Sequence, residues 1–108
     1  MKDIIERLYD EIYGPKLTPY ELLKNVKLPN YISVDFKNEN NFIIGTSKCH
    51  LPDGEIATFI YTFDNNDNLL SLISEVDSKT EELYNREKAI EKYYSLAQET
   101  IYPDTAVI

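Results

Sequence analysis

The feature that most constrains this fold is a series of strand-length apolar segments separated by short polar turns. Apolar side chains recur at every second position through Ile32, Val34 and Phe36, which is the spacing of a strand with one buried face. The polar stretch 37–41 ends this segment, and a second strand-length segment covers 42–50. Strands joined by such short turns pair as antiparallel hairpins, because a parallel connection needs a dozen or more residues.

Two more strands are predicted downstream. The segment 56–63 is apolar on both faces, which indicates a central or covered strand, and it follows a turn at 51–55 that contains Pro, Asp and Gly. After a polar turn at 64–68, the segment 69–76 is predicted as a fourth strand, although its apolar residues would also suit a helix. The sheet is therefore predicted as a four-stranded antiparallel β-meander.

Two helices are predicted ahead of the sheet. Apolar residues at helical spacing over 3–13 form one stripe, and Gly14 followed by Pro15 ends that helix. The stretch 18–21 reads Thr-Pro-Tyr-Glu, a capping box with proline at the first helical position. The helix that it opens must end before Pro29. These features predict an N-terminal helical hairpin.

A long helix is predicted after the sheet. The stretch 78–81 reads Ser-Lys-Thr-Glu, a second capping box, and an apolar stripe follows it, so we predict a helix over 79–99 that Pro103 closes. We expect this helix to pack on one face of the sheet. Residues 1–108 are thus predicted to form a single α+β domain.

The charge of the chain is negative and unevenly distributed. The formal net charge is −8, and residues 64–108 carry ten acidic and four basic residues, so this segment holds six of the eight excess negative charges. The only arginines are Arg7 and Arg86. Binding to nucleic acid or to an anionic membrane depends on Lys and Arg, so we expect neither kind of partner. The acidic segment is either a solvated surface or a docking surface for a basic protein.

Tyrosine is unusually frequent, with nine in 108 residues. It is enriched at protein interfaces, although it is also common at the boundary between a helix and a sheet. Acidic and tyrosine side chains coincide on the predicted C-terminal helix, where they form a candidate surface for a basic partner. That candidate surface consists of Tyr84, Tyr93, Tyr94, Glu81, Glu82, Glu87 and Glu91.

The sequence offers little for catalysis. Cys49 and His50 are the only residues of their kinds, and neighbours on a strand point to opposite faces, so they do not form a thiolate–imidazole pair. They are too few for a zinc site, and the chain has no phosphate-binding glycine loop. We therefore predict no catalytic residue, no cofactor, no metal and no enzymatic activity.

One segment partly matches a calcium-binding loop. Counted from Asp64, oxygen-bearing side chains stand at positions 1, 3, 5 and 12, the last being Glu75. Leu69 replaces the glycine that the sharp turn requires, and a strand rather than a helix is predicted before the loop. We interpret 64–68 as a hairpin turn, while weak calcium binding by 64–75 stays an alternative.

The sequence predicts a cytoplasmic protein. A single cysteine excludes an intrachain disulfide, the first residues lack the apolar stretch of a signal peptide, and no window is apolar enough to cross a membrane. Abundant Ile, Asn and Lys with few Ala and Arg are typical of an AT-rich coding sequence, as in a low-GC bacterium or its phage.

These observations favour a non-catalytic protein-binding module, of the inhibitor or immunity type, that uses its acidic, tyrosine-bearing C-terminal helix. A first alternative is a small-ligand module with a pocket between sheet and helices, near Phe59, Tyr61 and Phe63. A second is a homodimer or larger homo-oligomer whose interface is a sheet edge or the C-terminal tail.

Overall fold

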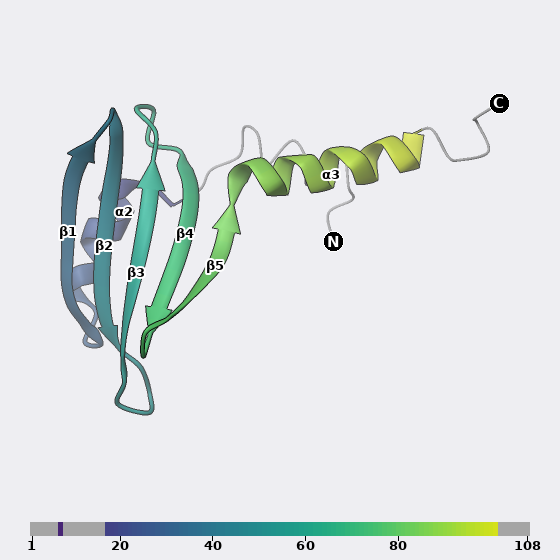
Figure 1. The fold of residues 1–108 in the computed structure, drawn as a ribbon. Helices are drawn as coiled ribbons and strands as arrows, with labels where there is room; N and C mark the ends of the chain where they lie inside the picture. The colour runs from purple at the N-terminus through teal and green to yellow at the C-terminus, as the bar shows by residue number, and fades with distance from the viewer. Residues whose placement is uncertain (1–6, 8–16, 102–108) are drawn as a thin grey trace. The chain divides into compact units, whose positions relative to one another are not determined.

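The computed structural model describes residue 7 and residues 17–101. The chain divides into two compact units, one of residues 16–85 and one of residues 1–15 together with 86–108. The first unit contains one short helix and the whole sheet, and the second contains the C-terminal helix (Figure 1). Apart from residue 7, the helix predicted over 3–13 lies outside the described residues, and so does the predicted helical hairpin that includes it.

The second predicted helix is confirmed. α2 covers Pro19–Lys24 and continues into η1, a 3-10 helix at Asn25–Lys27. Thr18 is the N-cap, and its hydroxyl accepts a hydrogen bond of 3.3 Å from the backbone N–H of Glu21. This bond satisfies one of the N–H groups that the first turn of a helix leaves without a partner.

The sheet is antiparallel and has five strands rather than the predicted four. Each strand pairs with the next along the chain, in the order β1-β2-β3-β4-β5, so the sheet is a meander (Figure 1). The strand predicted over 69–76 is confirmed as β4, which excludes the alternative of a helix there. The strands are β1 (Tyr31–Glu39), β2 (Phe42–His50), β3 (Ile56–Phe63), β4 (Leu69–Val76) and β5 (Lys79–Asn85).

The prediction of a helix from residue 79 is wrong, because residues 79–85 form β5. Asp77 and Ser78 have φ angles of 53° and 65°, which are those of a two-residue type I′ hairpin turn and not of a helix N-cap. The capping-box pattern at 78–81 is a local signal only. Pairing with the open side of β4 satisfies the same backbone groups and extends the sheet.

The C-terminal helix begins seven residues later than predicted. α3 covers Arg86–Ile101, carries Glu87 in its first turn and has Ala97 buried. Its predicted packing on one face of the sheet stays a prediction. Within residue 7 and residues 17–101, no helix has the length and apolar character needed to cross a membrane.

The core of the larger unit lies on the sheet face that α2 covers. Figure 1 shows α2 behind β1 and β2. Partly buried side chains from each of the five strands pack around this core, among them Val34 and Tyr84. The buried core cluster consists of Leu22, Tyr61, Phe63 and Leu69.

Gly45 on β2 allows the close approach of α2 to the sheet. A Cβ atom at this position would lie 2.9 Å from Cδ2 of Leu22 and 2.9 Å from Cε1 of Phe36. The Phe36 ring therefore occupies the space over Gly45, beside the fully buried Leu22. This contact joins β1, β2 and α2.

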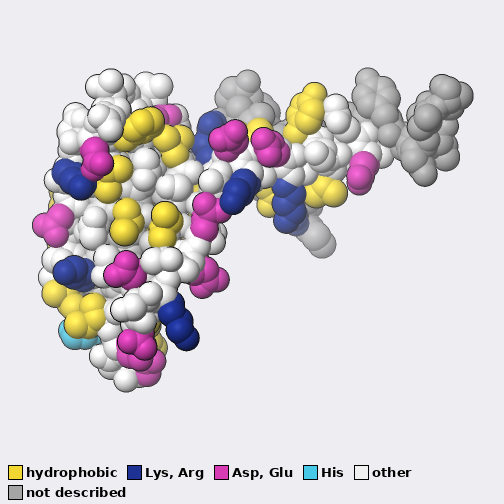
Figure 2. All heavy atoms as spheres, viewed as in Figure 1, with side chains coloured by type: hydrophobic (Ala, Val, Ile, Leu, Met, Phe, Trp, Pro, Cys, Tyr) yellow, Lys and Arg dark blue, Asp and Glu magenta, His cyan; other side chains and the backbone are white. Residues whose placement is uncertain are grey.

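The opposite sheet face is turned toward the viewer in Figure 2, where apolar, charged and other polar side chains are interspersed. The register places Thr46, Ile60 and Ile73 side by side across β2, β3 and β4 on this face. Ile60 and Ile73 are half-buried. An antiparallel sheet commonly has one face packed and the other solvated.

Candidate functional site

The residues predicted to form one acidic, aromatic surface lie on two different elements. Glu81, Glu82 and Tyr84 belong to β5, whereas the other four belong to α3 in the second unit. On α3, the exposed residues are Glu87, Glu91 and Tyr94, while Tyr93 is half-buried with the Lys92 ammonium 5.7 Å from its ring centroid. The seven residues therefore do not share one helix face.

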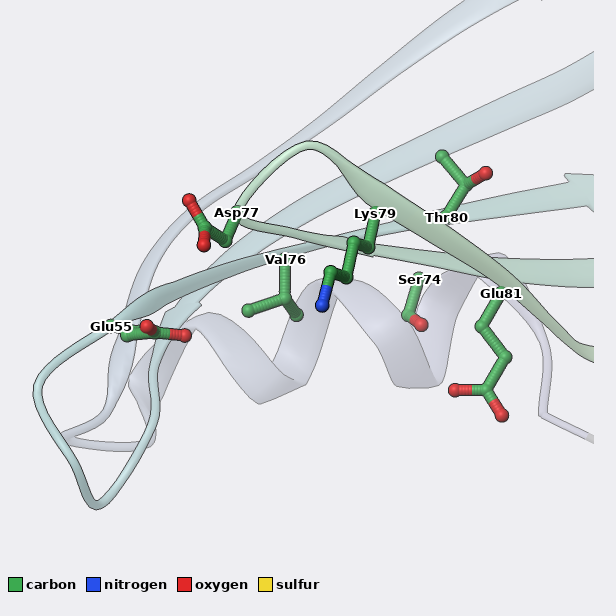
Figure 3. Close-up of a pocket in the computed structure, with 7 residues that line it drawn as sticks. All are labelled: Glu55, Ser74, Val76, Asp77, Lys79, Thr80 and Glu81. Carbon is green, nitrogen blue, oxygen red and sulfur yellow. The ribbon is translucent and has the colours of Figure 1, made fainter.

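The described residues form a hollow beside the β4–β5 hairpin. Its volume is about 550 Å³, which lies in the range of binding pockets for small molecules. Residues from both strands, from the turn between them and from the β2–β3 loop line it (Figure 3). We call it the hairpin hollow, and its residues are Glu55, Ser74, Val76, Asp77, Lys79, Thr80 and Glu81.

The strand register explains why these residues meet. Ser74 pairs with Glu81 and Val76 pairs with Lys79, so each pair places a small side chain of β4 next to a long side chain of β5. Paired residues of antiparallel strands point to the same face of the sheet. Short side chains on one strand beside long ones on the next produce the depression.

The β2–β3 loop holds Glu55 at the border of the hairpin hollow. The Leu51 N–H donates to the Glu55 carbonyl at 2.8 Å, and the Glu55 N–H donates to the Asp53 carboxylate at 2.9 Å. Gly54 has a φ of 92°, which an L residue rarely adopts, so glycine is required for this tight loop. The loop conformation therefore fixes the backbone of Glu55.

The hairpin hollow is negatively charged. Glu55, Asp77 and Glu81 contribute three carboxylates and Lys79 contributes one ammonium, which leaves an excess of two negative charges. Figure 3 shows the Lys79 side chain next to Val76, with Glu55 and Glu81 on either side of them. A smaller hollow of about 220 Å³ shares Glu55 and Asp77 and extends to Ile56.

The negative charge of the hairpin hollow suits an organic cation better than a metal ion. No group of three or more His, Cys, Asp or Glu within the described part of the chain could hold a metal. A Lys or Arg side chain, in contrast, has a charged end that can reach the carboxylates along the border. The arrangement can bind such a group.

The hairpin hollow does not lie near Phe59, Tyr61 and Phe63, where the sequence suggested a pocket for a small ligand. Phe63 is fully buried, Tyr61 is almost fully buried, and the two rings stack with centroids 6.2 Å apart. Phe59 packs against the same core. These aromatic side chains fill the space under α2.

The loop at 64–68 is the hairpin turn between β3 and β4. The Asp64 carboxylate accepts hydrogen bonds from the backbone N–H groups of Asn66 at 2.8 Å and Asn68 at 2.9 Å. Glu75 pairs with Thr58 near the far end of β4, well away from this loop. Because the strand is extended, Glu75 cannot join Asp64 in one ligand shell as the calcium-loop alternative requires.

Cys49 and His50 point away from each other, as predicted. Cys49 is buried and His50 is exposed. On the buried face, Cys49 pairs with Tyr31, and Asn25 donates a hydrogen bond of 3.5 Å to the Tyr31 hydroxyl. Burial raises the pKa values of Tyr31 and Tyr61 above their ordinary value of 10.0, so both hydroxyls stay protonated at neutral pH.

Sequence reasoning selected Glu81 but missed Glu55, Asp77 and Lys79. Glu55 lies in a loop, Asp77 lies in a turn, and Lys79 lies in β5, where the sequence predicts a helix. Only the sheet register brings the three together. The concentration of acids after residue 64 was the available signal for two of the three carboxylates. No family model matches the chain, and no curated protein or solved structure matches it either.

Proposed function

We propose that this protein is a non-catalytic protein-binding module, of the inhibitor or immunity type, whose hairpin hollow receives a Lys or Arg side chain of a basic partner. One observation carries the proposal: a hollow of about 550 Å³ has three carboxylates and one ammonium along its border. A guanidinium or ammonium inserted there would form charge-assisted hydrogen bonds with these carboxylates.

The surface around the hairpin hollow supports the same class of partner. Glu82 also belongs to β5 and is exposed. The excess negative charge of the chain would accelerate association with a basic protein, and added salt would weaken this effect. The acidic and tyrosine residues of α3 are the competing candidate contact for such a partner, and a variant of α3 distinguishes the two surfaces.

A small organic cation is the second candidate ligand. The volume of the hairpin hollow matches a small-molecule site, and its excess of two negative charges fits a linear polyamine. We place the protein in the cytoplasm, whichever of the two ligands it binds, because the chain has a single cysteine and Cys49 is buried as a free thiol.

Two charge-matched variants test the proposal. Glu55→Gln, Asp77→Asn and Glu81→Gln together remove the carboxylates of the hairpin hollow, and asparagine is well suited to the positive φ of residue 77. Glu87→Gln, Glu91→Gln and Glu99→Gln together remove the same charge from α3. Both variants and the wild type would be tagged and used to capture partners from cell lysate at low and high salt.

A basic protein captured at low salt by the wild type and the α3 variant, but not by the hairpin-hollow variant, would support the proposal. Calorimetric titration with spermidine distinguishes the second candidate, because a small cation would then bind without any protein partner. Equal capture by all three proteins would contradict a role of the hairpin hollow in partner binding.

A further inference from the structure

β1 is a long edge strand whose outer side pairs with none of the described residues. It covers Tyr31–Glu39 and is the first strand of the sheet order (Figure 1). Residues 35–39 are all exposed, and Phe36 among them is 37% exposed. An open edge strand of this length is a template for pairing with another strand.

The β1–β2 turn determines which backbone groups point outward. Asn40 and Asn41 have φ angles of 54° and 69°, so this is a two-residue type I′ turn, and Glu39 pairs with Phe42. In such a turn the Phe42 N–H bonds to the Glu39 carbonyl, and inward and outward residues then alternate along β1. The backbone groups that point away from β2 therefore belong to Val34, Phe36 and Asn38.

We propose that β1 pairs with β1 of a second copy of this chain, in an antiparallel register centred on Phe36. In this register the outward N–H and C=O groups of Phe36 bond to those of Phe36 in the other copy. Val34 of each copy bonds to Asn38 of the other. The two five-stranded sheets then join into one continuous sheet with twofold symmetry.

The charges of β1 are self-complementary in this register. Asp35 of each copy lies directly opposite Lys37 of the other, and both side chains are on the sheet face opposite to Phe36. These are pairs without backbone hydrogen bonds, in which the side chains are closest. Lys37 already forms an ion pair of 3.0 Å with Glu39 of its own strand, so each ammonium would lie between two carboxylates.

Neighbouring registers are less favourable. A register centred on residue 35 places Asp35 opposite Asp35 of the other copy. A register centred on residue 37 places Lys37 opposite Lys37 of the other copy. Directly opposed like charges destabilise strand pairing. The register centred on Phe36 avoids both repulsions and uses the whole segment 33–39.

Apolar side chains beside β1 would add buried area to the dimer. η1 lies against β1, and Val26 in η1, Leu28 after it and Ile32 at the start of β1 are all between 41% and 48% exposed. Such a group of exposed apolar side chains next to an open edge indicates an interface. β5 is the other edge, and its neighbouring Glu81 and Glu82 would disfavour self-pairing there.

A charge swap tests both the dimer and its register. Light scattering on purified protein should give twice the 12.6 kDa chain mass at submillimolar concentration. Asp35→Lys alone or Lys37→Asp alone would oppose like charges at both symmetric positions and raise the dimer dissociation constant about tenfold or more. The double variant Asp35→Lys, Lys37→Asp would restore wild-type association.

Two further variants keep the test decisive if a charge variant folds poorly. Asn38→Pro removes an outward N–H that β2 does not use, so it should leave the fold intact and weaken the dimer. Lys79→Asp changes the charge of the other edge strand and should leave the dimer unchanged. A monomeric wild type would overturn the proposal, and so would a dimer that is insensitive to the single charge variants and to Asn38→Pro.

Discussion

At the scale of single residues, the packing around Gly45 leaves little room for a side chain. Its missing side chain leaves room for the Leu22 methyl group and the Phe36 ring, each 2.9 Å from the position of a Cβ atom. One contact therefore couples the short helix to the edge strand. Close packing of this kind leaves little space for an added methyl group.

We expect Gly45→Ala to lower the free energy of unfolding by about 1–3 kcal/mol, because the added methyl group overpacks the contact. Urea unfolding monitored by circular dichroism measures this change. Thr46→Ala alters the same strand on its other face and should cost less. If the two variants were equally stable, the space at Gly45 would not be limiting.

The stability of the fold should depend on pH in the alkaline range because of Tyr61. Burial raises its pKa above 10.0, so the folded state keeps a proton that the unfolded chain releases near pH 10. The contribution is fully present below pH 10 and is lost as the pH rises toward the folded-state pKa. The free energy of unfolding should therefore fall above pH 10.

Tyr61→Phe should show a smaller fall in the free energy of unfolding than the wild type between about pH 9 and 11. Urea titrations at several pH values provide the measurement. Phe59→Leu changes the packing of the same strand without removing a titrating group, so it should keep the wild-type slope. An unchanged slope in Tyr61→Phe would assign the alkaline loss of stability to other groups.

At the scale of elements, the turn between β4 and β5 provides a test of the secondary structure of residues 79–85. The structure has a strand there, whereas the sequence predicts a helix. Ser78 has a φ of 65°, a conformation that costs an L residue about 1–2 kcal/mol and costs glycine almost nothing. Ser78→Gly should therefore raise the free energy of unfolding by about 0.5–1 kcal/mol, because glycine is favoured in a type I′ turn.

The sign of this change distinguishes the two structures of residues 79–85. If Ser78 capped a helix, replacing it with glycine would cost a few tenths of a kcal/mol. Thermal or urea unfolding of Ser78→Gly and the wild type gives the sign directly. Ser71→Gly, in the interior of β4, is the control and should destabilise, because glycine weakens a strand interior.

At the scale of the whole molecule, the proposed dimer and the hairpin hollow use opposite edges of one sheet. β1 and β5 are the two ends of the strand order, so pairing through β1 leaves the hollow beside β5 open in both copies. A dimer would then carry two partner sites. Two linked sites bind a partner that is itself multivalent more tightly than one site does.

Dimerisation should also make thermal stability depend on concentration. Because only folded chains can pair their β1 strands, a higher protein concentration favours the folded state and raises the melting temperature. Calorimetry on the wild type should show this rise, and Asp35→Lys should reduce it. A melting temperature that is the same in dilute and concentrated samples would count against a dimer of folded chains.

Local signals were sufficient for those parts of the fold that neighbouring residues determine. The capping box at Thr18, the alternation in β1 and the polar turns each act within a few residues, and the structure confirms α2 and the first four strands. The opposite orientation of Cys49 and His50 followed in the same way, from the geometry of an extended strand.

Only the tertiary structure decided that residues 79–85 form a strand and which residues make up the candidate site. Their capping-box pattern and apolar spacing suit a helix, but β4 offers a row of unpaired backbone groups, and pairing with it satisfies them across a two-residue turn. The same pairing moves Glu81 off the predicted helix and places it with Glu55, Asp77 and Lys79. The sequence by itself determined the order of turns and strands and the negative charge, while pairing between distant segments decided which charges share a surface.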